Sequence, residues 1–211
     1  MNSSQLAVPE LATVKVHGTT RQTFLLRATL AAGATYGATM VTPFVTRALA
    51  QEGGDVAILN YALTLEYLEA AFYETGIKEV GGLSSDEMRL AKEIRDNENE
   101  HVDALKATVT KLGGKPVAQP TFDFGAAFDS RSAFLKTANT LEDTGVSAYN
   151  GAAPNIASTE VLAAAGGIVQ IEARHAALIR LVRGRPPAPV AFDKASEMQE
   201  ILDAVTPFIK S

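Results

Sequence analysis

The chain has 211 residues, of which 46% are hydrophobic and 20% are charged, a composition that supports a packed globular core. Its net charge of −5 argues against nucleic-acid binding, which needs a basic surface. Because the chain has no cysteine, disulfides, iron–sulfur clusters and thiolate zinc sites are excluded, and any metal must be held by oxygen and imidazole ligands.

Residues 1–50 predict an export signal. The stretch TRQTFLL begins at Thr20, an Ala- and Gly-rich apolar segment follows, and Ala48 and Ala50 make a small-residue cleavage site. The segment resembles a twin-arginine signal in which Gln22 stands where the second arginine would be. We therefore expect a periplasmic or extracellular protein that contacts a membrane only through this segment if it is uncleaved. The alternative for this segment is an N-terminal amphipathic or membrane-anchoring helix, and the alternative location is the cytoplasm.

Removal of the signal makes the remaining chain more acidic. Residues 1–50 contain four basic residues and one acidic residue, so residues 51–211 carry a net charge of −8. An acidic domain favours cation binding over anion or nucleic-acid binding.

Residues 51–211 predict an all-α domain, because the apolar residues recur at helical spacing throughout. Asp55 is expected to cap the first helix and Gly76 to stop it, while Ser84 and Glu87 have the spacing of a capping box for the second. The helices are expected at residues 55–74, 84–112, 131–149 and 158–183, with a short one near 194–208 in an appendage that begins at about residue 184.

The connections between these helices predict two helical hairpins and a four-helix bundle. The first and last pairs have short turns, whereas residues 113–130 form a long linker. At about 3.3 Å per extended residue, this linker can span the length of a helix. We therefore expect a crossover that lets the second and third helices lie parallel.

The two hairpins repeat one motif. A Thr-Leu-Glu triplet is followed, seven residues after the glutamate, by a tyrosine, and then by a Glu-x-x-His pair. The first copy consists of Glu66, Tyr73, Glu98 and His101, and the second of Glu142, Tyr149, Glu172 and His175.

Helical spacing places the four glutamates and two histidines on apolar stripes that face one interior. Burying a bare carboxylate costs on the order of several kcal/mol, so the acids are either protonated or neutralised by cations. Two divalent ions would balance four carboxylates, and mixed carboxylate and imidazole ligands suit iron or manganese. The alternative is a polar core without metal. Glu69 is the rival of Glu66, but its counterpart in the second copy is Gly145, which makes it the weaker candidate.

The repeated motif resembles that of the ferritin-like superfamily. The segments LNYALTLEYLEAAFYETG, DNENEHVDAL and LEDTGVSAYNGA are similar to the ferritin-like domain family that includes desiccation-related and stress-induced proteins. The resemblance implies two iron ions, each with one glutamate and one histidine as terminal ligands, two bridging glutamates, and two tyrosines beside the ligands. In this chain the terminal pairs are Glu66 with His101 and Glu142 with His175, the bridges are Glu98 and Glu172, and the tyrosines are Tyr73 and Tyr149.

The resemblance further implies an oxidoreductase that oxidises iron or removes peroxide, with O2 or H2O2 as the second substrate. One alternative is a di-manganese enzyme of the catalase type. Another is a non-enzymatic stress or desiccation protein in which metal is structural or absent. Nothing in the sequence chooses between a monomer and a homo-oligomer.

Overall fold

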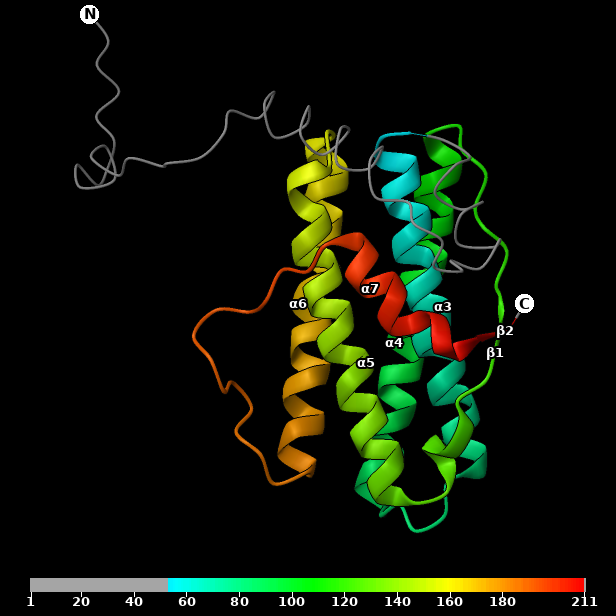
Figure 1. Ribbon diagram of the computed structural model, residues 1–211, viewed down its shortest axis with the longest axis vertical. Helices are drawn as coiled ribbons and strands as arrows, with labels where there is room; N and C mark the ends of the chain where they lie inside the picture. The colour runs from blue at the N-terminus through cyan, green and yellow to red at the C-terminus, as the bar shows by residue number, and fades with distance from the viewer. Residues whose placement is uncertain (1–52, 211) are drawn as a thin grey trace, which may run out of the picture. The chain divides into compact units, whose positions relative to one another are not determined.

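The computed structural model describes residues 53–210, and in this part of the chain four long α-helices form a bundle (Figure 1). The predicted export signal lies outside the described residues. None of the helices in residues 53–210 combines the length and the apolar character that a membrane crossing requires. The bundle helices are α3 (Asp55–Glu79), α4 (Ser85–Lys111), α5 (Arg131–Ala152) and α6 (Thr159–Val182).

The start of α4 follows the capping box predicted for it. The Ser84 side chain accepts a hydrogen bond from the Glu87 backbone N–H, and the Glu87 carboxylate accepts one from the Ser84 N–H at 2.8 Å. The predicted cap of α3 was wrong, because Gly54, with φ of 78°, occupies the N-cap position. The carboxylate of Asp55 instead accepts hydrogen bonds from the backbone N–H groups of Ala157 and Ser158, at 2.7 and 2.8 Å. Asp55 therefore ties the start of α3 to the turn that precedes α6.

The predicted end of α3 was also wrong, because the helix continues past Gly76 to Glu79. Gly76 is needed for packing. A Cβ atom there would lie 2.3 Å from the ring of Phe134 on α5, so only glycine leaves room for this aromatic side chain. Phe134 in turn stacks on Phe72, with ring centroids 5.1 Å apart.

The long linker crosses over along α3, as the sequence predicts. The side-chain amide of Asn60 donates to the Lys115 carbonyl at 3.1 Å and accepts from the Val117 N–H at 2.9 Å. The linker therefore begins beside the first turns of α3, and it ends where Phe134, near the start of α5, packs on Gly76. Because α5 begins at the far end of α3, it runs antiparallel to α3 and parallel to α4 (Figure 1).

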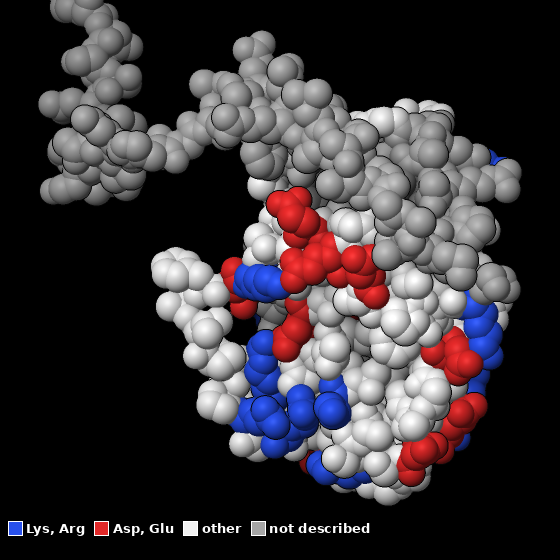
Figure 2. Space-filling view, viewed as in Figure 1, with Lys and Arg blue, Asp and Glu red and all other residues white. Residues whose placement is uncertain are grey.

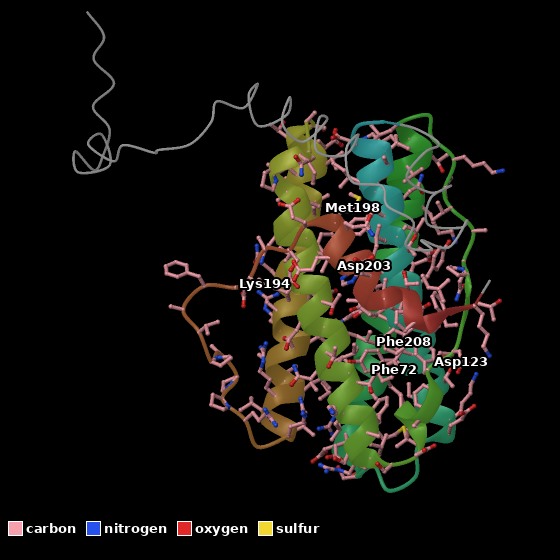
Figure 3. All side chains as sticks on the ribbon, in the orientation of Figure 1. Phe72, Asp123, Lys194, Met198, Asp203 and Phe208 are labelled. Atoms are coloured by element: carbon pink, nitrogen blue, oxygen red, sulfur yellow. The ribbon has the colours of Figure 1, made fainter. Side chains whose placement is uncertain are left out.

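The C-terminal segment packs on the outside of the bundle. Its helix α7 (Met198–Val205) is shorter than the predicted 194–208, and a 3₁₀ turn (Thr206–Phe208) follows. Two short strands, β1 (Thr121–Phe122) and β2 (Ile209–Lys210), then pair antiparallel and join the chain end to the linker. Phe208 packs against the apolar cluster that contains Phe72, and the Asp123 N–H donates to the Phe208 carbonyl at 2.8 Å (all three are labelled in Figure 3). The Lys210 ammonium lies 3.0 Å from the Asp123 carboxylate.

Apolar side chains close the bundle interior on both sides of a polar layer. One apolar cluster contains Leu63 and Val109, and the other contains Phe72 and Ile94, and all four side chains are fully buried. Along α4, the glutamate and histidine of the repeated motif lie between Ile94 and Val109. The two clusters therefore exclude water from the layer between them.

Candidate metal centre

Six polar side chains of the repeated motif meet in the layer between the two apolar clusters. Each bundle helix contributes: α3 and α5 supply one glutamate each, and α4 and α6 supply one Glu-x-x-His pair each. The carboxylates of Glu66, Glu98, Glu142 and Glu172 are fully buried, while His175 is 3% and His101 9% exposed.

These side chains form two groups that share two members. In each group, one ligand atom per residue lies within 4.8 Å of the ligand atoms of the others. The first group is Glu66, Glu98, His101 and Glu172, and the second is Glu98, Glu142, Glu172 and His175. Glu98 and Glu172, from α4 and α6, belong to both. Two cations placed in the two groups would therefore have these carboxylates in common.

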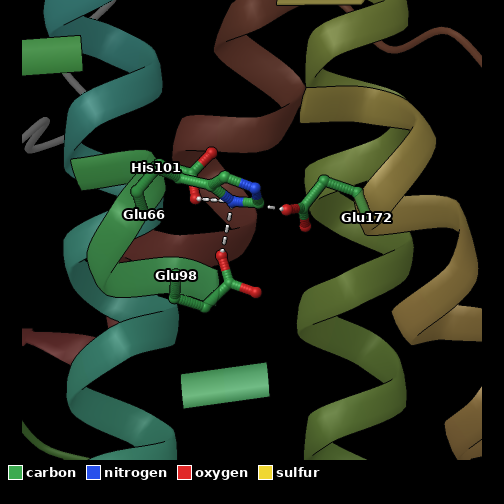
Figure 4. A group of neighbouring side chains, drawn as sticks. All are labelled: Glu66, Glu98, His101 and Glu172. Atoms are coloured by element: carbon green, nitrogen blue, oxygen red, sulfur yellow. Dashed lines mark hydrogen bonds and ion pairs between the residues drawn. The ribbon is translucent and has the colours of Figure 1, made fainter. Parts of the chain in front are cut away.

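His101 stands at the centre of the first group. Figure 4 shows its ring between Glu66 and Glu98 on one side and Glu172, from α6, on the other. Its Nδ1 lies 3.2 Å from a Glu66 oxygen, 3.0 Å from a Glu98 oxygen and 3.2 Å from a Glu172 oxygen. One ring nitrogen carries one hydrogen, so it cannot satisfy three carboxylates at once.

His175 has the corresponding place in the second group. Its Nδ1 is 2.9 Å from Glu98 Oε1 and 3.3 Å from Glu142 Oε2. These approaches bring opposite charges together without the alignment of a hydrogen bond, and Nδ1 of His175 has no hydrogen-bond partner among the described residues. The carboxylate oxygens that surround each ring nitrogen therefore mark positions that attract positive charge.

Buried atoms without partners are concentrated in this layer. Among the described residues they include Glu98 Oε1, Glu142 Oε2, both carboxylate oxygens of Glu172 and Nδ1 of His175. Each buried polar atom without a partner costs about 1–3 kcal/mol. Metal ions would satisfy these oxygens and nitrogens directly, so the donor set fits a pair of cations bound by carboxylates and imidazoles.

Burial in this layer disfavours the ionised form of the carboxyl groups and so changes their pKa values. Burial raises the pKa of Glu66 to about 7 and raises the pKa of Glu142, and burial with the charge of Glu98 holds the pKa of Glu172 well above its usual range. Burial also acts against the charged form of Glu98, but the rings of His101 and His175, 3.0 and 2.9 Å from its oxygens, lower its pKa to about 2. The metal-free layer therefore keeps some carboxyl groups protonated.

The pKa values of both histidines are raised, so both rings carry a positive charge in the metal-free layer. Burial opposes the charge on His101, but the close approach of the Glu172, Glu66 and Glu98 carboxylates to its ring raises its pKa to about 12. In the same way, burial opposes the charge on His175, and the carboxylates of Glu142 and Glu98 raise its pKa to about 10. Protonated imidazoles thus supply, in the metal-free layer, the charge that cations would supply in a loaded one.

Each tyrosine of the motif bonds a glutamate of the other hairpin. Tyr149 on α5 donates to Glu66 on α3 at 2.5 Å, and Tyr73 on α3 donates to Glu142 on α5. Burial and the adjacent carboxylates keep the pKa of both phenols well above the usual value, so they act as hydrogen-bond donors. The structure thus places both tyrosines beside the glutamates, as the resemblance implies, and their part in any reaction stays a prediction.

The sequence did not indicate Asn97 as part of the centre. Its side-chain amide lies 3.0 Å from Nε2 of His175, the ring nitrogen that faces away from the carboxylates. Groups that bond the outer nitrogen of a ligating histidine fix its tautomer and orientation. The repeat could not reveal Asn97, because its counterpart before Glu172 is Ile171.

Glu69, the weaker ligand candidate in the sequence, is buried like the residues of the repeated motif. It is 3% exposed, and its Oε2 atom has no hydrogen-bond partner among the described residues. It belongs to neither of the two ligand groups. The six residues of the repeated motif thus form the two groups, and Glu69 is an additional carboxylate in the same interior.

The fold and this layer define a class of protein: a four-helix bundle with one glutamate on each of two helices and a Glu-x-x-His pair on each of the other two. The sequence profile of the ferritin-like domain matches residues 54–185, and the chain belongs to this family. No curated protein shows significant similarity to the chain.

Proposed function

We propose that this protein binds two iron ions and acts as a di-iron carboxylate oxidoreductase that oxidises ferrous iron or removes peroxide. The observation that supports this is the pair of buried ligand groups with Glu98 and Glu172 in common. Four ionised carboxylates with two neutral imidazoles would balance two divalent ions completely. The loaded layer would then need no protonated histidine.

In this proposal each of the six residues binds metal at a position set by its helix. Glu66 and His101 would hold one ion, Glu142 and His175 would hold the other, and Glu98 and Glu172 would be available to both. Iron bound there would supply the redox chemistry, which for peroxide removal is the reduction of H2O2 to two water molecules with two electrons, one from each ferrous ion, and two protons. Carboxylates tolerate the change in metal charge because they can bind through one oxygen or two.

The surrounding residues would control this chemistry. Tyr149 and Tyr73 fix one oxygen of each terminal glutamate and so direct the other oxygen toward the interior. Asn97 orients the His175 ring. The apolar clusters above and below keep bulk water away from the ions, which strengthens every electrostatic interaction inside.

The biological setting we propose is a stress response outside the cytoplasm. The export signal predicted for residues 1–50 supports the location, and the resemblance to desiccation-related and stress-induced proteins inferred from the sequence supports the role. On the face that carries α7, acidic side chains gather in one group and basic side chains in another (Figure 2). We propose metal ions and O2 or H2O2 as partners and no nucleic acid, because the net charge of the chain is −5.

Metal analysis of the purified full chain tests the proposal. We expect two iron ions per chain and, on aerobic addition of ferrous iron, the rise of ferric absorbance. Glu98→Ala should abolish stoichiometric loading, whereas Glu100→Gln, an exposed residue on the same helix, should not. Oxygen release from peroxide by a manganese-loaded protein would favour the di-manganese alternative. A protein that stays empty when both metals are supplied would support a non-enzymatic bundle.

A further inference from the structure

Glu69 is a buried carboxylate that the two ligand groups do not use. It follows Glu66 by one helical turn on α3, so its side chain enters the same interior. The side chain is 97% buried, and Oε2 has no hydrogen-bond partner among the described residues. In its ionised form a carboxylate in this position is stable only if a positive charge or a hydrogen-bond donor reaches it.

Gly145 on α5 makes the room that Glu69 occupies. A Cβ atom at Gly145 would lie 3.1 Å from Glu69 Oε1 and 2.9 Å from Glu172 Oε2. Carboxylates from α3 and α6 therefore converge on one point of α5, where any side chain would crowd them. Gly145 stands three residues after Glu142 as Glu69 stands three after Glu66, so the repeat is broken at this position. One hairpin supplies a carboxylate, and the other supplies the space for it.

The neighbour of Glu69 at this point is a shared member of the two groups. Glu172 belongs to both, and both of its oxygens lack hydrogen-bond partners among the described residues. The free oxygen of Glu69 therefore lies in the same part of the interior as a carboxylate that would contact both ions. A small shift of the Glu69 side chain would bring it to an ion held by Glu172.

We propose that Glu69 is a fifth carboxylate of the centre, which binds one ion of the pair and stabilises its oxidised state. This rests on the proposed function in one respect, that cations occupy the two groups. Four carboxylates balance two divalent ions, so a fifth leaves an excess negative charge in the reduced state. Two trivalent ions carry two more positive charges, and the fifth carboxylate then offsets part of this increase. Glu69 thus stabilises the trivalent state of the metal ions, and the missing side chain at Gly145 leaves room for Glu69 in the centre.

The test is a cobalt titration of the full chain, because Co2+ is stable in air and its visible spectrum reports its ligands. We compare the wild type with Glu69→Gln, which keeps the shape of the side chain and removes its charge. We expect both proteins to bind two Co2+ per chain, with a changed spectrum and at least tenfold weaker binding of one ion in the variant. In the iron-loaded protein, a tenfold loss of preference for the oxidised state would raise the midpoint potential by about 59 mV for a one-electron couple.

Two further variants make the result specific. Gly145→Ala, which crowds both carboxylates, should also change the cobalt spectrum, whereas Glu79→Gln, an exposed residue on α3, should not. An unchanged spectrum and affinity in Glu69→Gln would overturn the proposal. Complete loss of one ion from a folded Glu69→Gln protein would overturn it too, because Glu69 would then be an indispensable ligand and not an additional one.

The outcome is separable from that of the proposed function. If the wild type binds two Co2+ and Glu69→Gln matches it, the fifth carboxylate is refuted and the di-metal centre stands. If Glu69→Gln changes the cobalt spectrum but the iron-loaded wild type neither oxidises ferrous iron nor consumes peroxide, the oxidoreductase is refuted and the role of Glu69 as a ligand stands.

Discussion

The phenol of Tyr149 on α5 donates a hydrogen bond to Oε1 of Glu66 on α3, 2.5 Å away. The other oxygen of Glu66 is 3.2 Å from Nδ1 of His101. Tyr149 therefore fixes one oxygen of the carboxylate and leaves the other for the centre. Tyr73 on α3 donates in the same way to Glu142 on α5, so each hairpin provides the hydrogen-bond donor for a glutamate of the other. The polar layer thus positions α3 and α5 relative to each other.

Replacement of Tyr149 by phenylalanine should weaken both the fold and the centre. The change leaves Glu66 Oε1 buried without its donor, which costs about 1–3 kcal/mol in the free energy of unfolding of the metal-free protein. Metal affinity should fall about 10- to 100-fold, the usual loss when the partner of a ligand is removed. Denaturant unfolding with a chelator present, and metal titration, measure the two effects.

The matched control for this variant is Tyr67→Phe. The Tyr67 hydroxyl donates to the Val117 carbonyl in the crossover at 3.4 Å and does not touch the centre. Its loss should leave metal affinity unchanged. If Tyr149→Phe binds metal as tightly as Tyr67→Phe does, the hydrogen bond does not position Glu66 for a metal ion.

The helical repeat predicted the bundle, and the six side chains that it singled out meet in one layer of the structure. Their role as metal ligands stays a prediction. The repeat could single them out because the 3.6-residue period fixes which residues share a helix face. The errors have a different cause. Gly76 and Asp55 were interpreted as local signals of a helix end and a helix start, whereas each serves a contact with a distant segment, to Phe134 and to the Ala157 turn. A single sequence carries no record of such contacts.

The same limit explains Glu69 and Asn97. Symmetry between the hairpins was the main guide to the site, and neither residue has a counterpart in the second hairpin. A search for matched pairs therefore ranks Glu69 below Glu66 and does not find Asn97. Burial and distance in the folded chain are what place Glu69 in the interior and Asn97 beside His175.

The metal-free protein should lose stability as pH rises from about 5 to 9. The pKa of Glu66 is about 7 in the fold against an ordinary value of 4.5, so between these values the native state holds a proton that the unfolded chain releases. The pKa of His175 is about 10 and that of His101 about 12 against 6.5, so above pH 6.5 the native state again binds more protons. Stability falls with pH wherever the native state binds the excess protons. Glu98, with a pKa of about 2, acts in the opposite direction only below about pH 5.

Denaturant unfolding at pH 5, 7 and 9 with a chelator present measures this dependence. In metal-saturated protein the trend should reverse, because metal ions displace the protons and bind more tightly as pH rises. A metal-free protein whose free energy of unfolding is constant or increases over this range would show that the layer does not hold the protons assigned to it.

Removal of the Asn97 side chain should weaken the centre without unfolding the bundle. In Asn97→Ala the ring of His175 loses the group that bonds Nε2, so its orientation is no longer fixed. We expect metal affinity to fall about 10- to 100-fold. The control is Asn99→Ala, because the exposed Asn99 amide donates only to the Arg95 carbonyl of its own helix, at 2.9 Å. Equal metal titration curves for the two variants would exclude a role for Asn97.

The two kinds of helical glycine should respond in opposite ways to alanine. Alanine normally favours a helix over glycine by about 1 kcal/mol. At Gly167 on α6 an added Cβ meets no atom within 4 Å, so Gly167→Ala should raise the free energy of unfolding by about 0.5–1 kcal/mol. At Gly76 the Cβ would lie 2.3 Å from the Phe134 ring, which is 1% exposed and stacked on Phe72 and so cannot move aside.

Overpacking of this kind costs about 1–3 kcal/mol, which exceeds the gain in helix propensity, so Gly76→Ala should lower the melting temperature while Gly167→Ala raises it. The double variant Gly76→Ala with Phe134→Leu should recover part of the loss, because the smaller side chain leaves space for the added methyl group. If Gly76→Ala is as stable as the wild type, Phe134 does not need the space that Gly76 provides, and the length of α3 needs another explanation.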